Sequence, residues 1–334
     1  MIKVIYSRRK FLETAKLGFV FLLTACKSAT KKVVITLNQS FISESFKNIL
    51  PITWNQKNIK FSDENLKQNS QILYNSNLLL INDGWVHKLN LDNFQEINQT
   101  FIDRIDNRSK KYLTLFDSSF KNKLFPIGVI PYAVVIKNQN KYLLNYEKNW
   151  DFLLSKTLKG KIIMPNSPRI IFSISQRINI ENPLNKLLEQ VSIYDDQNAL
   201  DWLINTEAVV AIIPLSHCKK YLNVDSRLSL FFPNNGVPLM WNFLLIKSDL
   251  TKETLFELIE KLENKKNIDL LANEGWYLPF NNVYSQSKYD FINTSSRFPT
   301  TPSKNCWDNS WSFQPLTKLE KIRLEEIWNK SSTP

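Results

Sequence analysis

The chain has 334 residues, a hydrophobic content of 43% and a formal net charge of +12 at neutral pH. This composition is typical of a globular protein, and its length exceeds the comfortable size of one hydrophobic core, so we expect two lobes. The lysines are scattered along the chain rather than gathered into a stripe, which argues against nucleic acid as a partner.

Residues 1–25 have the layout of an export signal. Basic residues from Lys3 to Lys10 precede a short apolar run, Leu17 to Leu23. That run is far shorter than the roughly 20 residues needed to cross a bilayer. Ser7 to Leu12 reads SRRKFL and matches the twin-arginine pattern. The alternative is a general secretory signal that holds two adjacent arginines. Removal of these residues takes away five basic and one acidic residue and leaves a net charge of about +8.

A cysteine follows the apolar run. Leu23 to Cys26 reads LTAC, which resembles the bacterial lipobox, in which the cysteine is acylated after cleavage. Acyl chains hold a protein on a membrane without a spanning helix. We therefore expect lipidation at Cys26, a tether over residues 26–32 and a mature chain outside the cytoplasm, in the periplasm or cell envelope. The alternative is a chance cysteine at the end of the signal.

Short buried strands alternate with helices after the tether, which predicts an open α/β sheet. Strands are expected at 33–37, 78–81, 132–136, 161–164, 208–213, 228–232 and 239–246, and helices at 43–50, 85–89, 150–154, 168–177, 199–204, 216–222, 251–271 and 316–328. Residues 281–310 are expected to form a loop.

Two segments are candidate crossings between lobes. Residues 124–137, LFPIGVIPYAVVIK, form an apolar run punctuated by Pro126, Gly128 and Pro131. Such punctuation suits a strand that leaves one sheet and enters another. Residues 239–246 are the candidate for the return crossing.

The residues that usually carry catalysis or bind metals are sparse. The histidines are His87 and His217, and apart from Cys26 the cysteines are Cys218 and Cys306. No second histidine or cysteine lies at ligand spacing from His217 and Cys218, so neither a metal nor a cofactor is expected. A disulfide between Cys218 and Cys306 stays open, because spacing alone does not establish one. We expect no enzymatic activity.

The order of these segments resembles the solute-binding proteins of ABC importers, specifically the polyamine-binding branch of spermidine and putrescine receptors. The segments that carry the resemblance are the lipobox, LLLINDGWVHKL, FPIGVIPYAVVIKN, KGKIIMPNSPR, AVVAIIPLS, FPNNGVPLMWNFLLI and NEGWYLP. The resemblance covers nearly the whole mature chain.

The resemblance implies the periplasmic-binding-protein fold of type II, with two open α/β sheets, an inter-lobe cleft and two crossover strands. Lobe 1 is expected to hold residues 33–130 and 244–290, and lobe 2 residues 131–243 and 300–334. The implied partners are a small solute, captured by hinge closure, and a membrane permease that receives it. A monomer is implied as well.

The resemblance also places candidate ligand-binding residues in the cleft, where aromatic faces and carboxylates would hold ammonium groups. These residues are Asn38, Gln39, Ser40, Asn82, Asp83, Trp85, Tyr132, Ser167, Arg169, Ser216, Trp241, Asn242, Trp276 and Tyr277.

The carboxylates that the family uses for amines are replaced in this sequence. Ser167 and Ile170 stand where the resemblance expects acids around Arg169, and Asn242 stands where it expects an aspartate. Asp83 is the one carboxylate placed near the cleft. Besides a polyamine, the sequence therefore favours a neutral or zwitterionic solute, or a monocation held by tryptophan and Asp83.

Three other functions stay open. An envelope enzyme would need a nucleophile with a base, and Asp83 with His87 is the pair at helical spacing. A ferric-iron receptor of the same fold would usually carry neighbouring tyrosines, and this chain has no Tyr-Tyr pair. A sensor lipoprotein without a permease is the third.

Overall fold

The computed structural model describes residues 32–62, 65, 68, 72, 73, 75–137, 149–195, 197–222, 224–247, 250–281 and 301–332. The predicted export signal and Cys26 lie outside these residues. Residues 34–334 form one compact unit, separate from residues 1–33. Among the described helices, none combines the length and the apolar character that crossing a bilayer requires.

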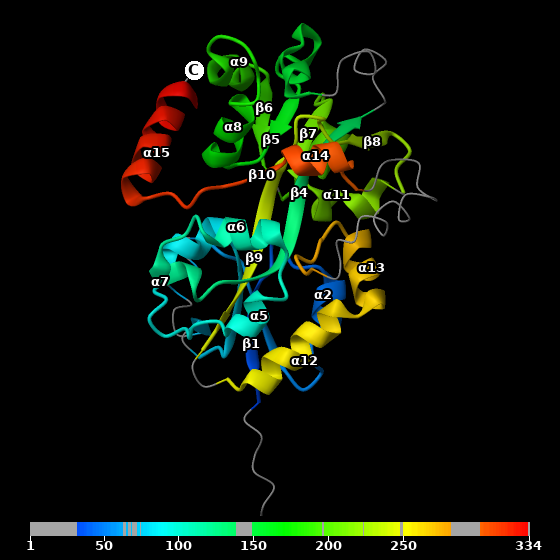
Figure 1. Cartoon of the computed structure of the whole chain (residues 1–334). Coiled ribbons are helices and arrows are strands. Elements are labelled where there is room, and N and C mark those ends of the chain that lie inside the picture. Colours follow the sequence, from blue (N-terminus) through cyan, green and yellow to red (C-terminus); the bar gives the residue numbers. More distant parts are fainter. Residues whose placement is uncertain are drawn as a thin grey trace, which may run out of the picture. The chain divides into compact units, whose positions relative to one another are not determined.

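A curled sheet runs through the compact unit (Figure 1). Its described strands follow the order β2-β1-β3-β9-β4-β7-β5-β6, with β10 beside β9 and β8 beside β4. The bounds are β1 Val34–Asn38, β2 Asn55–Ile59, β3 Leu78–Asn82, β4 Phe125–Lys137, β5 Ile162–Met164, β6 Val191–Tyr194, β7 Val210–Pro214, β8 Leu228–Phe231, β9 Pro238–Ile246 and β10 Trp311–Ser312. We use lobe 1 for the side that holds β1, β2 and β3, and lobe 2 for the side that holds β5, β6, β7 and β8.

The strand β4 carries the sheet from one lobe to the other, as the sequence predicts. Residues 125–131 pair with β9, and residues 132–136 pair with β7 of lobe 2. The two expected sheets are therefore joined along β4. Gly128 is required there because the indole of Trp276 lies where a Cβ atom would be. The return strand β9 is buried throughout and pairs with β3 and β4.

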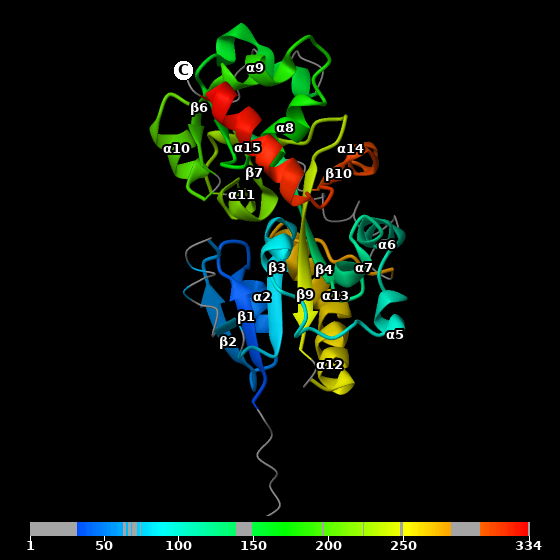
Figure 2. The ribbon, with the colours of Figure 1, turned by 90° about the vertical axis from the view of Figure 1, so that its left-hand side faces the viewer.

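Helices cover both lobes (Figures 1 and 2). In lobe 1 they are α2 Glu44–Ile49, the 3-10 helix η1 Asp83–Lys88, α5 Gln99–Ile102, α6 Asn107–Leu113, α7 Ser118–Lys121, α12 Lys252–Glu263 and α13 Lys265–Asn273. In lobe 2 they are η2 Trp150–Leu154, η3 Lys156–Leu158, α8 Pro168–Ser175, α9 Pro183–Leu188, α10 Ala199–Asn205 and α11 Leu215–Leu222. The C-terminal segment adds α14 Lys304–Asn309 and α15 Lys318–Ser332.

Two sequence predictions of local structure are corrected. The single helix expected over 251–271 is two helices, because Asn264 has extended backbone, with ψ of 128°, and caps the start of α13. The loop expected over 281–310 contains α14, which begins where the Ser303 hydroxyl accepts a hydrogen bond from the Cys306 amide. Residues 282–300 lie outside the described residues.

Arginines of both lobes contact the C-terminal segment, which comprises residues 301–332. The guanidinium of Arg108, on α6 of lobe 1, lies 5.1 Å from the Trp307 ring and donates a hydrogen bond to the Trp307 carbonyl oxygen. From lobe 2, Arg177 lies 4.6 Å from the Trp311 ring and Arg169 lies 4.6 Å from the Phe313 ring. Cation–π contacts of this kind stabilise a segment without needing a carboxylate partner.

The two described cysteines are both free and buried. Burial raises the pKa of Cys218 to about 12 and that of Cys306 to about 11. No disulfide joins them in this structure.

Candidate functional site

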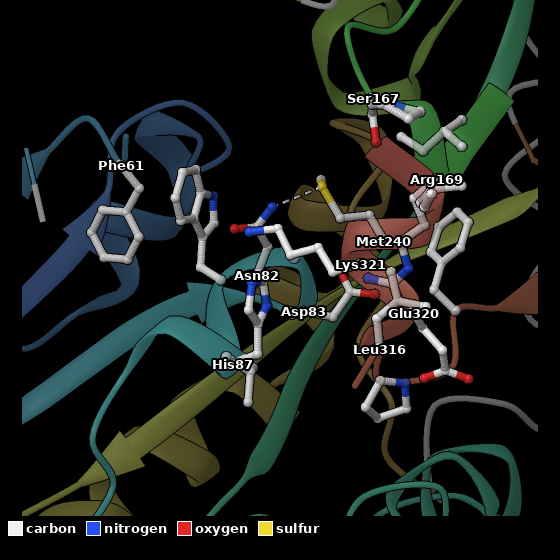
Figure 3. Close-up of a pocket in the computed structure, with 18 of the residues that line it drawn as sticks. Phe61, Asn82, Asp83, His87, Ser167, Arg169, Met240, Leu316, Glu320 and Lys321 are labelled. Carbon is white, nitrogen blue, oxygen red and sulfur yellow. Dashed lines mark hydrogen bonds between the residues drawn. The ribbon is translucent and has the colours of Figure 1, made fainter. Parts of the chain in front are cut away.

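A cavity of about 780 Å³ lies between the lobes. Lobe 1 contributes η1 and residues near α7, and lobe 2 contributes the N-terminal turn of α8. The third wall is the C-terminal segment from Phe313 to Glu325 (Figure 3). The strands β3 and β4 bring residues to the same cavity, since Asn82 ends β3 and Tyr132 lies in the middle of β4.

Asp83 provides the buried carboxylate of this cavity. It follows β3 directly, and its side chain is 8% exposed. Its Oδ2 accepts a hydrogen bond of 3.0 Å from the hydroxyl of Tyr112. Burial raises the pKa of Asp83, while the positive charge of Arg169 acts in the opposite direction. A cationic group in the cavity would stabilise the ionised carboxylate in the same way as Arg169.

Aromatic rings make much of the remaining wall. Trp85 packs edge-on against Phe61, with 6.1 Å between the ring centroids, and the ammonium group of Lys88 lies 4.8 Å from the Trp85 ring. The aromatic residues that line the cavity are Phe41, Phe61, Trp85, Phe116, Phe120, Tyr132 and Phe313. Rings of this kind bury apolar parts of a ligand and attract cations over their faces.

Arg169, at the start of α8, lines the same cavity as Asp83. Proline at the first position of that helix fixes the chain there, as the sequence predicts. The guanidinium donates a hydrogen bond of 2.7 Å to the Gln314 carbonyl oxygen and stacks on Phe313. The C-terminal segment therefore holds Arg169 against the cavity (Figure 3).

A second cavity of about 480 Å³ continues from the first and shares Ser40, Phe41 and Gln197 with it. In this second cavity, the Glu274 Oε1 atom accepts a hydrogen bond from the Ser45 hydroxyl. The Glu274 Oε2 and Ser216 Oγ atoms are buried and have no hydrogen-bond partner among the described residues.

The structure brings half of the predicted site residues to the first cavity. Those that line it are Ser40, Asn82, Asp83, Trp85, Tyr132, Ser167 and Arg169. Ser216 lines the second cavity, as does Ser40. At the end of β3, Asn82 accepts a hydrogen bond from Asn38 and donates one to the sulfur of Met240.

The remaining predicted residues line neither cavity. Gln39 is exposed beside β1, and Asn38 is buried below Asn82. Trp241 is fully buried and stacks on Tyr112, with 4.8 Å between the ring centroids. Trp276 is fully buried and stacks on Phe46. Tyr277 packs against Trp307, and Asn242 is buried with its amide nitrogen unpartnered among the described residues.

Sequence reasoning missed the C-terminal wall of the cavity. The helix α15 begins with a capping box, in which the Glu320 carboxylate accepts from the Thr317 amide and the Thr317 hydroxyl accepts from the Glu320 amide. That pattern predicts where the helix starts. It does not predict that Lys321 and Leu324 face a cleft built from residues far earlier in the chain.

No family model matches this chain, and no curated protein matches it. Solved structures, in contrast, do match this chain. The spermidine/putrescine substrate-binding protein PotD of Streptococcus pneumoniae has a TM-score of 0.67 and 10% identity, over 90% of this chain and 98% of that one. The PotD lipoprotein of Treponema pallidum has a TM-score of 0.60 and 10% identity, over 91% and 99%. A eukaryotic thiaminase-I has a TM-score of 0.59 and 11% identity, over 90% and 99%.

The chain therefore has the two-lobed fold of the periplasmic binding proteins. The resemblance to the spermidine and putrescine receptors of ABC importers is confirmed at the level of the fold, at low identity. The thiaminase shares that fold, so architecture alone does not separate binding from catalysis.

Proposed function

We propose that this protein is a solute-binding receptor of an ABC importer, anchored outside the cytoplasm by a lipid on Cys26. The observation that carries the proposal is the cavity between the lobes, lined from both sides and furnished with aromatic rings and a buried carboxylate. Ligands of two-lobed receptors occupy such a cavity and draw the lobes together. The permease would then receive the solute from the closed form.

The chemistry of the cavity favours a small organic solute that carries an amino group. Asp83 is the buried group suited to an ammonium partner, and Trp85 and Phe61 suit the adjoining apolar part. Polyamines belong to this class, as do amino acids and quaternary amines. A single buried carboxylate in the first cavity favours a solute with one ammonium group there.

The alternative of an envelope enzyme rests on the thiaminase that shares the fold. Against it, the thiols of Cys218 and Cys306 are buried with raised pKa values, and neither lines either of the two cavities described above. A cysteine nucleophile needs a lowered pKa and an accessible thiol. Asp83 hydrogen-bonds Tyr112 instead of orienting His87 as a base. Binding therefore fits these residues better than nucleophilic catalysis does.

The proposal is tested by a thermal-shift screen of the purified full chain against polyamines, amino acids, quaternary amines, sugars and ferric iron, followed by titration calorimetry. Ligand at 100 times its Kd stabilises a protein by about 2.7 kcal/mol, which is readily detected. Trp85→Ala is expected to weaken binding of the hit about tenfold, because a ring that covers the ligand is lost, and to leave the melting temperature within a few degrees.

Trp241→Ala is the matched control. Trp241 lies in the core, stacks on Tyr112 and donates a hydrogen bond of 2.7 Å to Ser312. Its loss is expected to lower the free energy of unfolding by about 3–5 kcal/mol. A screen with no hit, or a hit whose affinity is unchanged in Trp85→Ala, would contradict the proposed site.

A further inference from the structure

The C-terminal helix α15 adds the positive charge of Lys321 to a cavity that Arg169 already lines. Lys321 is half-buried on α15 and lines the first cavity together with Arg169 of α8 and His87 of η1 (Figure 3). These groups come from three separate elements. We infer that Arg169, Lys321 and His87 form a subsite for the anionic group of the solute, so that the receptor selects a zwitterion over the corresponding cation.

Electrostatics across the cavity support this arrangement. The pKa of His87 is lowered first by burial and then by the positive charges of Lys321 and Arg169. The pKa of Lys88 is lowered by burial and by Lys321. The positive charges of Lys321 and Arg169 thus act on neighbouring groups of the cavity, and an anion bound between these two charges would relieve their repulsion.

The carboxylates around the cavity compensate this cluster only in part, although Asp83 already interacts with the positive charge of Arg169. Asp83 is hydrogen-bonded to Tyr112, and Glu320 is engaged in the capping box at the start of α15. Glu325 approaches Lys321 at 3.8 Å, but its side chain is 57% exposed, so water weakens that pair. Asp117 is exposed at the start of α7.

The subsite and Asp83 line one cavity, and the positive charge of Arg169 acts on the Asp83 carboxyl. Groups of both signs in one cavity suit a compact solute that carries both charges. An ammonium group fits Asp83 and the rings, and a carboxylate or another oxyanion fits the guanidinium of Arg169 and the ammonium of Lys321. A second ammonium group would meet the positive charges of Arg169 and Lys321 and be repelled. This inference rests on the proposed receptor function and names its substrate class.

The test uses two matched pairs of compounds with the full chain: 4-aminobutanoate against putrescine, and glycine betaine against choline. Within at least one pair, calorimetry is expected to give a Kd about tenfold lower for the zwitterion. The reason is that its anionic group gains charge-assisted hydrogen bonds in the proposed subsite. Lys321→Met should raise the Kd of that zwitterion about tenfold and should not raise that of its cation, because a repelling charge is removed. Lys321→Glu should reverse the preference.

Arg323→Met is the matched control. Arg323 lies on the same helix, is exposed and does not line the cavity, so its loss should leave both affinities unchanged. Tighter binding of the cation in both pairs, or equal effects of Lys321→Met and Arg323→Met, overturns the inference. If the four compounds fail while another solute of the screen binds, the inference falls and the receptor function stands. If no solute binds, both fall.

Discussion

The ammonium group of Lys219 is buried. Lys219 itself lies on α11, and its side chain reaches the C-terminal end of α13. Its Nζ donates a hydrogen bond of 2.6 Å to the Ala272 carbonyl oxygen, which belongs to the last turn of that helix. A helix C-terminus favours a positive charge, and the hydrogen bond satisfies one donor. Burial is nevertheless the larger effect and lowers the pKa of Lys219 to about 8.

This pKa predicts how stability changes with pH. The unfolded chain keeps the lysine proton up to about pH 10.5, whereas the folded chain releases it near pH 8. Between these values the unfolded state binds more protons, so this group makes the free energy of unfolding rise with pH by up to about 1.4 kcal/mol per pH unit. Urea unfolding of wild type and Lys219→Met at pH 7.5 to 10 measures the effect. Wild type should show the steeper rise; parallel curves would contradict the assigned cause.

At the scale of elements, the break between α12 and α13 depends on one side chain. The Asn264 Oδ1 atom accepts a hydrogen bond of 3.0 Å from the Lys266 amide, and the carbonyl oxygen accepts from Asn267 and Ile268. Asn264→Ala removes the cap and is expected to lower the free energy of unfolding by about 1 kcal/mol. Asn264→Ser keeps a capping oxygen and should cost little. The comparison is made by urea unfolding, and equal losses in both variants would mean that the cap does not stabilise the junction.

Most elements of the sheet could be predicted from the sequence, because their signals are local. The apolar run Leu78 to Ile81 and the turn after it locate β3 and place Asp83 at its end. Pro168 after Ser167 locates the start of α8 and so places Arg169. Those residues reach the cavity because strand ends and helix starts gather at one edge of an open α/β sheet.

The rest of the site depends on packing between distant segments. Trp85 follows the turn after a buried strand, and Trp241 lies in the predicted return crossing, so the sequence suggests the cleft for both. In the structure, Trp85 lines the cavity, whereas Trp241 stacks on Tyr112 in the core. No local pattern indicates that Tyr112, on α6, packs against Trp241. Likewise, α15 reaches the cavity through stacking of aromatic residues in the C-terminal segment on arginines of both lobes.

At the scale of the whole molecule, the proposed lipid on Cys26 determines where the protein is found. Cys26→Ser removes the acylated thiol, and each buried CH₂ of an acyl chain contributes about 0.8 kcal/mol to membrane binding. The variant is therefore expected to move from the membrane fraction to the soluble fraction of the cell envelope, as measured by fractionation and immunoblotting. A variant in which a serine remote from the signal, such as Ser229, is changed to alanine serves as the control. Retention of Cys26→Ser on the membrane would refute the anchor.

The pairing of β4 with β9 limits how the lobes can move. These antiparallel strands are hydrogen-bonded from Phe125 with Leu244 to Pro131 with Leu239, and their residues are buried. A slip by one residue would turn every buried side chain of a strand to the opposite face, at a large energetic cost. Shear between the strands is thus blocked, whereas bending both strands together across their width leaves the hydrogen bonds between them in place. Opening and closing of the lobes would therefore bend β4 and β9 together, and the lengthwise alignment of these two strands is fixed when the chain folds.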